Sequence, residues 1–176
     1  LKDSIESVWA QTMQDFELIV VDNGSTDESL EIARSYQGRP GYILIENKAN
    51  TGFSYAVNQG IRMAKGEYVA LFNNDAFAEP DWLENLIAAA EQDPKIFGVS
   101  SLMIRHFERE LADDAGDYVT LLGFACKRGD GLRWQRYQKP GRVFSACGGA
   151  ALYRKSILDE IGLFDENFFA YFEDVD

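Results

Sequence analysis

Short apolar runs alternate along the chain with stretches in which apolar residues recur at helical spacing. Three of the runs are typical of buried strands, and each is followed by a polar turn and then by a helical stretch. The expected strands are 16–21, 42–45 and 68–72, and the expected helices are 1–11, 25–36, 54–65 and 80–90. Strands that alternate with helices favour right-handed crossovers and a parallel sheet. The first half of the chain therefore predicts an α/β fold with a mostly parallel central sheet flanked by helices.

Two local signals indicate where helices begin. Ser25-Thr26-Asp27-Glu28 fits a capping box, which predicts a helix start there. Pro80 is suited to be the first residue of a helix because the first helical N–H needs no partner. A further strand is expected at 96–103.

The second half of the chain has a weaker pattern. Residues 106–139 contain scattered glycines and aromatic residues, which predict loops with short strands over one face of the sheet. We expect a strand to restart at 143–144, residues 147–151 to pack tightly, and a short helix to follow at 154–161.

Length and composition are those of a single globular domain. The chain has 176 residues, of which 46% are hydrophobic and 26% are charged. Its formal net charge of -12 argues against a nucleic-acid partner, because such partners are held largely by Lys and Arg. The two cysteines, Cys126 and Cys147, predict reduced thiols rather than a disulfide framework. No apolar run is long enough to span a membrane, and the start at Leu1 has no signal peptide, so we expect a fragment cut at both ends.

The central apolar run ends in three polar residues, Asn73-Asn74-Asp75. In open α/β sheets ligands bind beyond the carboxyl ends of the strands, so this tip is a candidate site. If the tip is extended, Asn73 and Asp75 point to the same side, about 6.5 Å apart. A polar turn with a purely local backbone role is the alternative.

Polar turns follow all three expected strands, at 22–26, 50–52 and 73–75. In a parallel sheet they lie at the same edge, and the glycines within them allow a ligand to approach the backbone closely. Helix N-termini just beyond the turns offer free N–H groups to anions. This is the outline of a nucleotide pocket, although strand-to-helix turns are polar in α/β proteins generally.

The last residues combine aromatic and acidic side chains. Glu173, Asp174 and Asp176 follow a run of Phe and Tyr at 168–172. Aromatic walls exclude water, and crowded carboxylates raise one another's pKa toward the range that a general base needs. An exposed acidic tail is the alternative. The single histidine, His106, has no partner at metal-ligand spacing, and we expect it to be structural.

With these motifs in place, the chain resembles family 2 of the inverting glycosyltransferases, which have a Rossmann-like GT-A fold. The resemblance covers almost the whole chain. It rests on Val20-Val21-Asp22-Asn23-Gly24-Ser25-Thr26-Asp27, on Asn50-Thr51-Gly52-Phe53 with Asn58-Gln59-Gly60-Ile61, on Asn73-Asn74-Asp75, and on Gly162-Leu163-Phe164-Asp165-Glu166 through Tyr171-Phe172-Glu173-Asp174. The Asn-Asn-Asp tip and Asp114-Ala115-Gly116 are more similar to the rhamnosyltransferase-like branch.

The resemblance implies roles for particular residues. It implies that Asp22 holds the nucleobase or ribose, that Asp75 is the ligand of a Mg²⁺ or Mn²⁺ on the diphosphate, and that Asp174 is the catalytic base with Glu173 beside it. Asn73 stands where the family has a first acid, and an amide brings no charge to the metal. The remaining residues implied for nucleotide binding are Asn23, Asn50, Gly52, Asn58, Asn73 and Asn74.

The resemblance also implies an activity and partners. We expect metal-assisted transfer of a hexosyl or deoxyhexosyl group from a UDP- or dTDP-sugar to a hydroxyl of a glycan or lipid-linked saccharide. The expected setting is polysaccharide biosynthesis for the cell envelope, in the cytoplasm or peripherally at the inner face of the membrane. Residues 1–103 are expected to bind the nucleotide and 104–176 to carry the acceptor and catalytic part of one domain. A missing opening strand leaves a sheet edge through which a homodimer could form.

Two other classes of protein stay open on the sequence. A sugar nucleotidyltransferase has the same fold, but its glycine-rich basic loop is not found here. A non-catalytic module that binds sugar nucleotides or glycans would not need the acids at positions 75 and 174.

Overall fold

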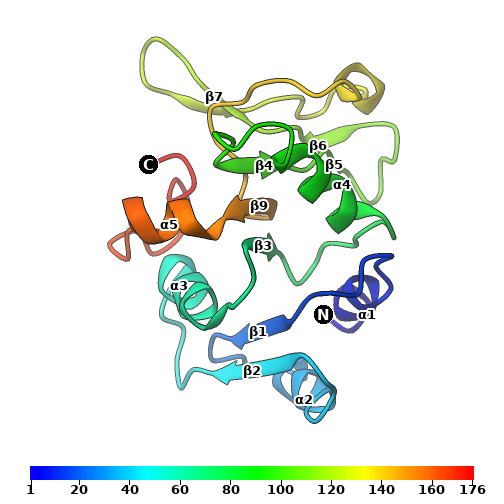
Figure 1. Cartoon of the computed structure of the whole chain (residues 1–176), viewed down its shortest axis with the longest axis vertical. Coiled ribbons are helices and arrows are strands. Elements are labelled where there is room, and N and C mark those ends of the chain that lie inside the picture. The colour runs from blue at the N-terminus through cyan, green and yellow to red at the C-terminus, as the bar shows by residue number, and fades with distance from the viewer.

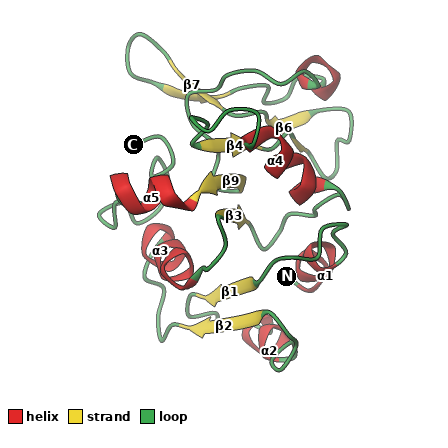
Figure 2. Ribbon diagram, viewed as in Figure 1, coloured by secondary structure: helices red, strands yellow, loops and turns green.

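The computed structural model describes residues 1–176, and its helices and strands alternate through the first half of the chain (Figures 1 and 2). The first elements are α1 (Lys2–Trp9), β1 (Leu18–Asp22), α2 (Ser29–Arg34), β2 (Tyr42–Glu46), α3 (Phe53–Met63), β3 (Tyr68–Phe72) and α4 (Trp82–Ala90). The later elements are β4 (Gly98–Ser100), β5 (Met103–Ile104), β6 (Ala112–Asp114), β7 (Asp117–Val119), β8 (Ala125–Lys127), the 3-10 helix η1 (Trp134–Tyr137), β9 (Ala150–Arg154) and α5 (Lys155–Ile161). No helix is both long enough and apolar enough to span a membrane.

The strands form a mixed sheet arrangement. β1 pairs with β2 in parallel, from Leu18 opposite Tyr42 to Asp22 opposite Glu46. β9 lies between β3 and β4 and is antiparallel to both. The α/β fold class is confirmed, but the pairing is less parallel than expected because β9, a late strand, inserts between two strands that come earlier in the chain.

β9 is the element that the sequence pattern missed. A strand was expected at 143–144, but the structure has none there, and the nearest pairing is an isolated bridge between Ser145 and Asp117. The strand begins instead at Ala150, after two glycines, and four of its five residues are fully buried. Only Ala150 and Ala151 of this strand fall within the stretch expected to pack tightly, and two alanines give little β signal.

Three element boundaries also differ from expectation. No capping box forms: α2 begins at Ser29, whose N–H donates to Asp27 Oδ1 at 2.9 Å. Pro80 lies two residues before α4, in a turn closed by the Trp82 N–H on the Glu79 carbonyl at 3.0 Å, where proline's fixed φ is favoured. The strand expected at 96–103 is split into β4 and β5.

The hydrophobic core packs against both faces of the sheet that contains β9. Tyr153 faces a cluster that includes Ile61 of α3 and Leu158 of α5, whereas Leu152 faces Leu83 and its neighbours on α4. Successive residues of a strand point to opposite faces, so β9 is covered on both sides. Figure 1 shows α3 and α5 on one side of β9 and α4 on the other. The start of β9 is therefore held firmly, and this is where the candidate site lies.

Candidate functional site

The carboxyl end of β1 forms a tight polar turn. The buried Asp22 carboxylate accepts hydrogen bonds from the N–H groups of Gly24 and Ser25, both at 3.2 Å. Gly24 has φ +79°, and a Cβ there would lie 2.7 Å from the backbone of Ala49. The turn after β1 thus packs directly against the turn after β2.

Asn23 joins these two turns. Its Nδ2 donates to Asn50 Oδ1 at 3.0 Å and to the Gly52 carbonyl at 3.1 Å, and its Oδ1 accepts from the Thr51 N–H at 3.0 Å. Asn50 Oδ1 also accepts from the Gly52 N–H at 3.0 Å. The structure therefore brings together Asp22, Asn23, Asn50 and Gly52, as the sequence predicted.

Asn58 does not face a ligand. Its side chain is only 1% exposed and lies on α3. Its Nδ2 donates to the Phe164 carbonyl at 2.8 Å and to Glu166 Oε1 at 3.0 Å, and its Oδ1 accepts from the Phe164 N–H at 3.1 Å. Because its side-chain donors and acceptor bind within the chain, Asn58 connects α3 to the segment after α5, and the structure gives it a structural contact rather than an exposed position.

The tip beyond β3 is a turn rather than extended chain. β3 ends at Phe72, and the Ala76 N–H donates to the Asn73 carbonyl at 3.2 Å. The strand-like alternation expected for Asn73 and Asp75 is therefore wrong. Asn73, Asn74 and Asp75 are nevertheless all exposed, as a ligand-binding tip requires.

Two neighbouring glycines before β9 connect this tip to the end of the chain. The Gly148 N–H donates to Asp174 Oδ2 at 3.0 Å, and the Asn73 N–H donates to the Gly149 carbonyl at 2.9 Å. A Cβ on Gly149 would lie 3.3 Å from Asn73 Nδ2. Asn73 and Asp174, which are far apart in sequence, are thus held by the adjacent residues Gly149 and Gly148.

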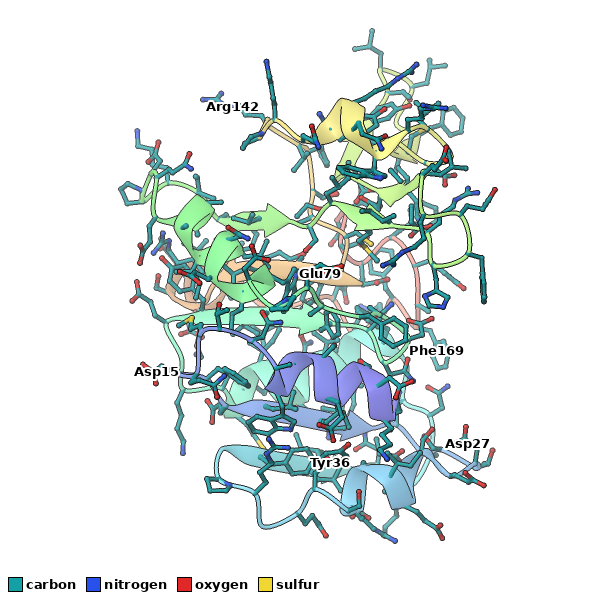
Figure 3. The ribbon with its side chains drawn as sticks, turned by 90° about the vertical axis from the view of Figure 1, so that its right-hand side faces the viewer. Asp15, Asp27, Tyr36, Glu79, Arg142 and Phe169 are labelled. Carbon is teal, nitrogen blue, oxygen red and sulfur yellow. The ribbon has the colours of Figure 1, made fainter.

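Asn73, Asp75 and Asp174 line one open cleft of about 1820 Å³. The cleft continues to Glu79 and Arg142, which Figure 3 shows near the centre and at the upper edge of that view. Asp22 does not line it. The structure therefore places two of the three predicted carboxylates, Asp75 and Asp174, on the same cleft.

The turns around Asp22 are linked to the cleft through the start of α3. The Phe53 N–H donates to the Phe169 carbonyl at 2.6 Å, and the Phe53 ring lies against Gly148. Figure 3 shows Phe169 on the same side of the molecule as Asp27, just beyond β1. The C-terminal segment thus lies across the edge where β1 ends.

Glu173 and Asp174 are partly buried, so they are not an exposed tail. Glu173 Oε2 is buried without a hydrogen-bond partner. Burial raises the pKa of Glu173, and the negative charge of Asp174 adds to the effect.

The sequence analysis missed an acid near this pair. Burial raises the pKa of Asp117 in β7, and the charge of Asp174 raises it further. Ser145 donates to its Oδ2 at 3.3 Å. Its only signal in the sequence was its position directly after Asp114-Ala115-Gly116.

His106 was expected to be structural, but it is exposed and lines the cleft. Its ring stacks on Phe77, with 5.4 Å between the ring centroids.

The protein side chains alone do not form a complete metal site. No group of three or more His, Cys, Asp or Glu side chains is arranged to hold a metal ion. Asp75 supplies one exposed carboxylate, and Asn73 supplies an amide oxygen nearby in the chain. Mg²⁺ is commonly held by one or two carboxylates together with substrate phosphates and water, so these donors fit a metal that arrives with a diphosphate.

The family model described as "Glycosyl transferase family 2" matches residues 1–162. The glucosyl-dolichyl phosphate glucuronosyltransferase of Haloferax volcanii is 26% identical over 165 residues, covering 94% of this chain and 51% of the relative. The poly-beta-1,6-N-acetyl-D-glucosamine synthase of Staphylococcus aureus is 26% identical over 167 residues, covering 94% of this chain and 39% of the relative. The chain therefore spans about half or less of these relatives.

Among solved structures, the chain is similar to the mannosyltransferase PcManGT from Pyrobaculum calidifontis in complex with GDP-Man and Mn²⁺. The TM-score is 0.66 at 21% identity, covering 94% of this chain and 44% of that one. At this identity the likeness concerns the fold.

Proposed function

Because the chain belongs to glycosyl transferase family 2 and has the GT-A fold, we propose that its protein transfers a sugar from a nucleoside diphosphate sugar to an acceptor hydroxyl, with inversion at the sugar carbon. The observation that carries this proposal is the arrangement at Gly148 and Gly149. These two residues hold Asp174 and Asn73 at the cleft that Asp75 also lines.

The donor would extend from the turns after β1 and β2 to the tip after β3. Asp22, Asn23 and Asn50 form the nucleoside end, and Asp75 would hold Mg²⁺ or Mn²⁺ together with the donor's phosphates. The metal would neutralise charge on the departing diphosphate. Asn73 brings no charge, so metal affinity depends more on the bound phosphates than it would with an acid at this position. The fold relative was solved with GDP-Man and Mn²⁺, which supports this type of donor.

We propose Asp174 as the general base. Its Oδ2 accepts from the Gly148 N–H, which fixes the carboxylate and leaves Oδ1 to take the proton from the attacking hydroxyl. The hydroxyl oxygen bonds to the sugar carbon as the bond to the diphosphate breaks, so one base on one face suffices for inversion. A retaining path through a covalent intermediate would need a nucleophile on the other face. Glu173 lies beside Asp174 and adds negative charge.

We propose a saccharide or lipid-linked saccharide as the acceptor. The names of the two relatives above, one with a dolichyl phosphate and one with a polysaccharide, support this class. A lipid-linked acceptor would bring the protein to the inner face of the membrane. Within the chain, we propose that residues 1–103 bind the donor and that residues 104–176 bind the acceptor and carry the catalytic base.

Replacing Asp174 tests the proposal. In the full-length protein that contains this chain, Asp174→Asn should reduce transfer at least a hundredfold, because general-base catalysis contributes about 10²–10⁴ in rate. Nucleoside diphosphate binding, measured by thermal shift with Mn²⁺, should be unchanged. The assay should follow release of nucleoside diphosphate rather than pyrophosphate.

Asp159→Asn is the matched control. Asp159 is an exposed acid on α5 that pairs with Lys155, away from the cleft. This variant should turn over normally, and normal turnover by Asp174→Asn as well would reject the assignment.

A further inference from the structure

Three aromatic rings gather at the cleft beyond Asp75. Phe77 follows the β3 tip, and His106 and Phe107 come from the loop between β5 and β6. His106 stacks on Phe77 at 5.4 Å, and Phe107 meets the edge of His106 at 4.8 Å between centroids. All three line the cleft that contains Asp75 and Asp174.

These rings are open to solvent to an unusual degree. Phe107 is 95% exposed and Phe77 is 52% exposed. A single exposed apolar side chain needs no explanation, but a contiguous group in a cleft marks a binding surface. Aromatic faces gain most when another flat apolar face covers them.

The loop that carries two of the rings is held in place by its own contacts. Arg105 pairs with Glu108 at 2.7 Å and with Asp130 at 2.9 Å. Its N–H also donates to the Leu111 carbonyl at 3.0 Å, and the Leu111 N–H donates to the Glu108 carbonyl at 2.8 Å. A surface fixed before binding loses less entropy when a ligand arrives.

The position of the rings indicates which of the two substrates they would contact. Figure 1 shows β1 and β2 at one end of the molecule and β5 and β6 toward the other, with β3 between them. The nucleoside end of the site is at β1 and β2, so the rings lie on the other side of Asp75. A group bound there is on the side of the acceptor.

We propose that Phe77, His106 and Phe107 form a platform that binds a pyranose ring of the acceptor. The C–H face of the sugar stacks on the aromatic rings, and Arg109, which also lines the cleft, is available to its hydroxyl groups. This inference rests on the proposed function, because it takes the occupant to be the saccharide that receives the transferred sugar.

Direct binding tests the platform without turnover. The full-length protein, labelled with ¹³C in its Phe and His rings, is titrated with the methyl glycosides of glucose, galactose, N-acetylglucosamine and rhamnose. At least one glycoside should shift the His106 and Phe107 ring signals saturably. If none of the four shifts these signals up to its solubility limit, the platform is rejected.

Kinetics provide the second test, with a glycoside that binds serving as acceptor. Phe107→Ala should raise the acceptor KM about tenfold, the value of one lost aromatic contact, and leave the donor KM within about twofold. Phe107→Tyr should restore the wild-type KM. The Phe107 ring is exposed, so neither substitution should lower the stability of the fold.

Phe124→Ala is the matched control, since Phe124 is 65% exposed but does not line the cleft. An equal rise in KM in this control, or a rise in donor KM in Phe107→Ala, would overturn the platform. Failure of the unmodified protein to bind any nucleoside diphosphate would instead overturn the proposed function.

Discussion

Asp114 is a fully buried carboxylate in the second half of the chain. Its Oδ1 accepts from the Gly116 N–H at 2.5 Å, and its Oδ2 has no hydrogen-bond partner. Burial raises the pKa of Asp114 to about 6. Because the pKa of Asp114 is higher in the folded state than in the unfolded chain, the protonated carboxyl favours folding. This contribution to the free energy of unfolding is fully present below the ordinary pKa of an aspartate and is lost as the pH rises through about 6.

Asp114→Asn should remove this pH dependence, because the amide is neutral throughout. Between pH 4 and pH 7 the free energy of unfolding of the wild type should fall relative to the variant by on the order of 2 kcal/mol. Urea denaturation at several pH values measures this difference. As a control, Asp113→Asn should keep the wild-type pH dependence, since Asp114 is still present. If the free energy of unfolding changed with pH in the same way in the wild type and in Asp114→Asn, this role of Asp114 would be wrong.

At the scale of single residues, the sequence located candidate site residues best where a side chain lies within a motif. Asp75 belongs to the polar tip after a strand and Asp174 follows an aromatic run, and both line the cleft. The burial of Asn58 could not be predicted, because a buried amide that binds backbone has the same sequence signal as one that binds a ligand. The contact of Phe77 with His106 could not be predicted, because it depends on how the β5–β6 loop packs against the β3 tip.

Among the elements, the N-terminus of α3 carries a constrained contact. Gly52 has φ +87°, and a Cβ there would lie 2.7 Å from the Phe169 carbonyl oxygen. The Phe53 N–H donates to the same oxygen. Substitution at position 52 must therefore move the segment that leads to Asp174.

Gly52→Ala should lower the stability of the domain and also reduce transfer. Gly38→Ala is a matched control: Gly38 has φ +89° but nothing within 4 Å of the added carbon. Both variants should lose about 1–3 kcal/mol from the positive φ, measured by urea denaturation, and Gly52→Ala should lose more because of the clash with the Phe169 carbonyl. Only Gly52→Ala should also lose transfer activity, by tenfold or more. Equal transfer rates in the two variants would show that the Phe169 contact does not position Asp174.

Element order was largely predictable because hydrophobic periodicity is local. The strand at 150–154 was not, because its pairing partners, β3 and β4, lie about 50 to 80 residues earlier in the chain. The split of the expected strand at 96–103 has a similar cause. Ser101 donates its N–H to the Ala150 carbonyl at 3.1 Å and accepts from the Trp82 Nε1–H at 2.8 Å, so tertiary contacts fix the break.

Over the whole molecule, the site depends on two halves of the chain sharing one sheet. β9 pairs with β3 and β4, and the glycines that precede it hold Asn73 and Asp174. The sequence predicted the fold class and placed the turns after β1 and β2 side by side, as the Asn23 hydrogen bonds show. It did not predict that Asp22 lies outside the cleft, because the α/β pattern places turns at an edge without giving the distances between them.

We propose that a metal and a diphosphate bind at the cleft between the β3 tip and Asp174. Paramagnetic line broadening by Mn²⁺ locates them, in the full-length protein with the nucleoside diphosphate that gives the largest thermal shift. The backbone amide signals of Asn74, Asp75, Gly148 and Asp174 should broaden strongly when both are added, while those of Gly38 and Leu121 stay sharp. Broadening centred elsewhere, or none at these four residues, would contradict the account.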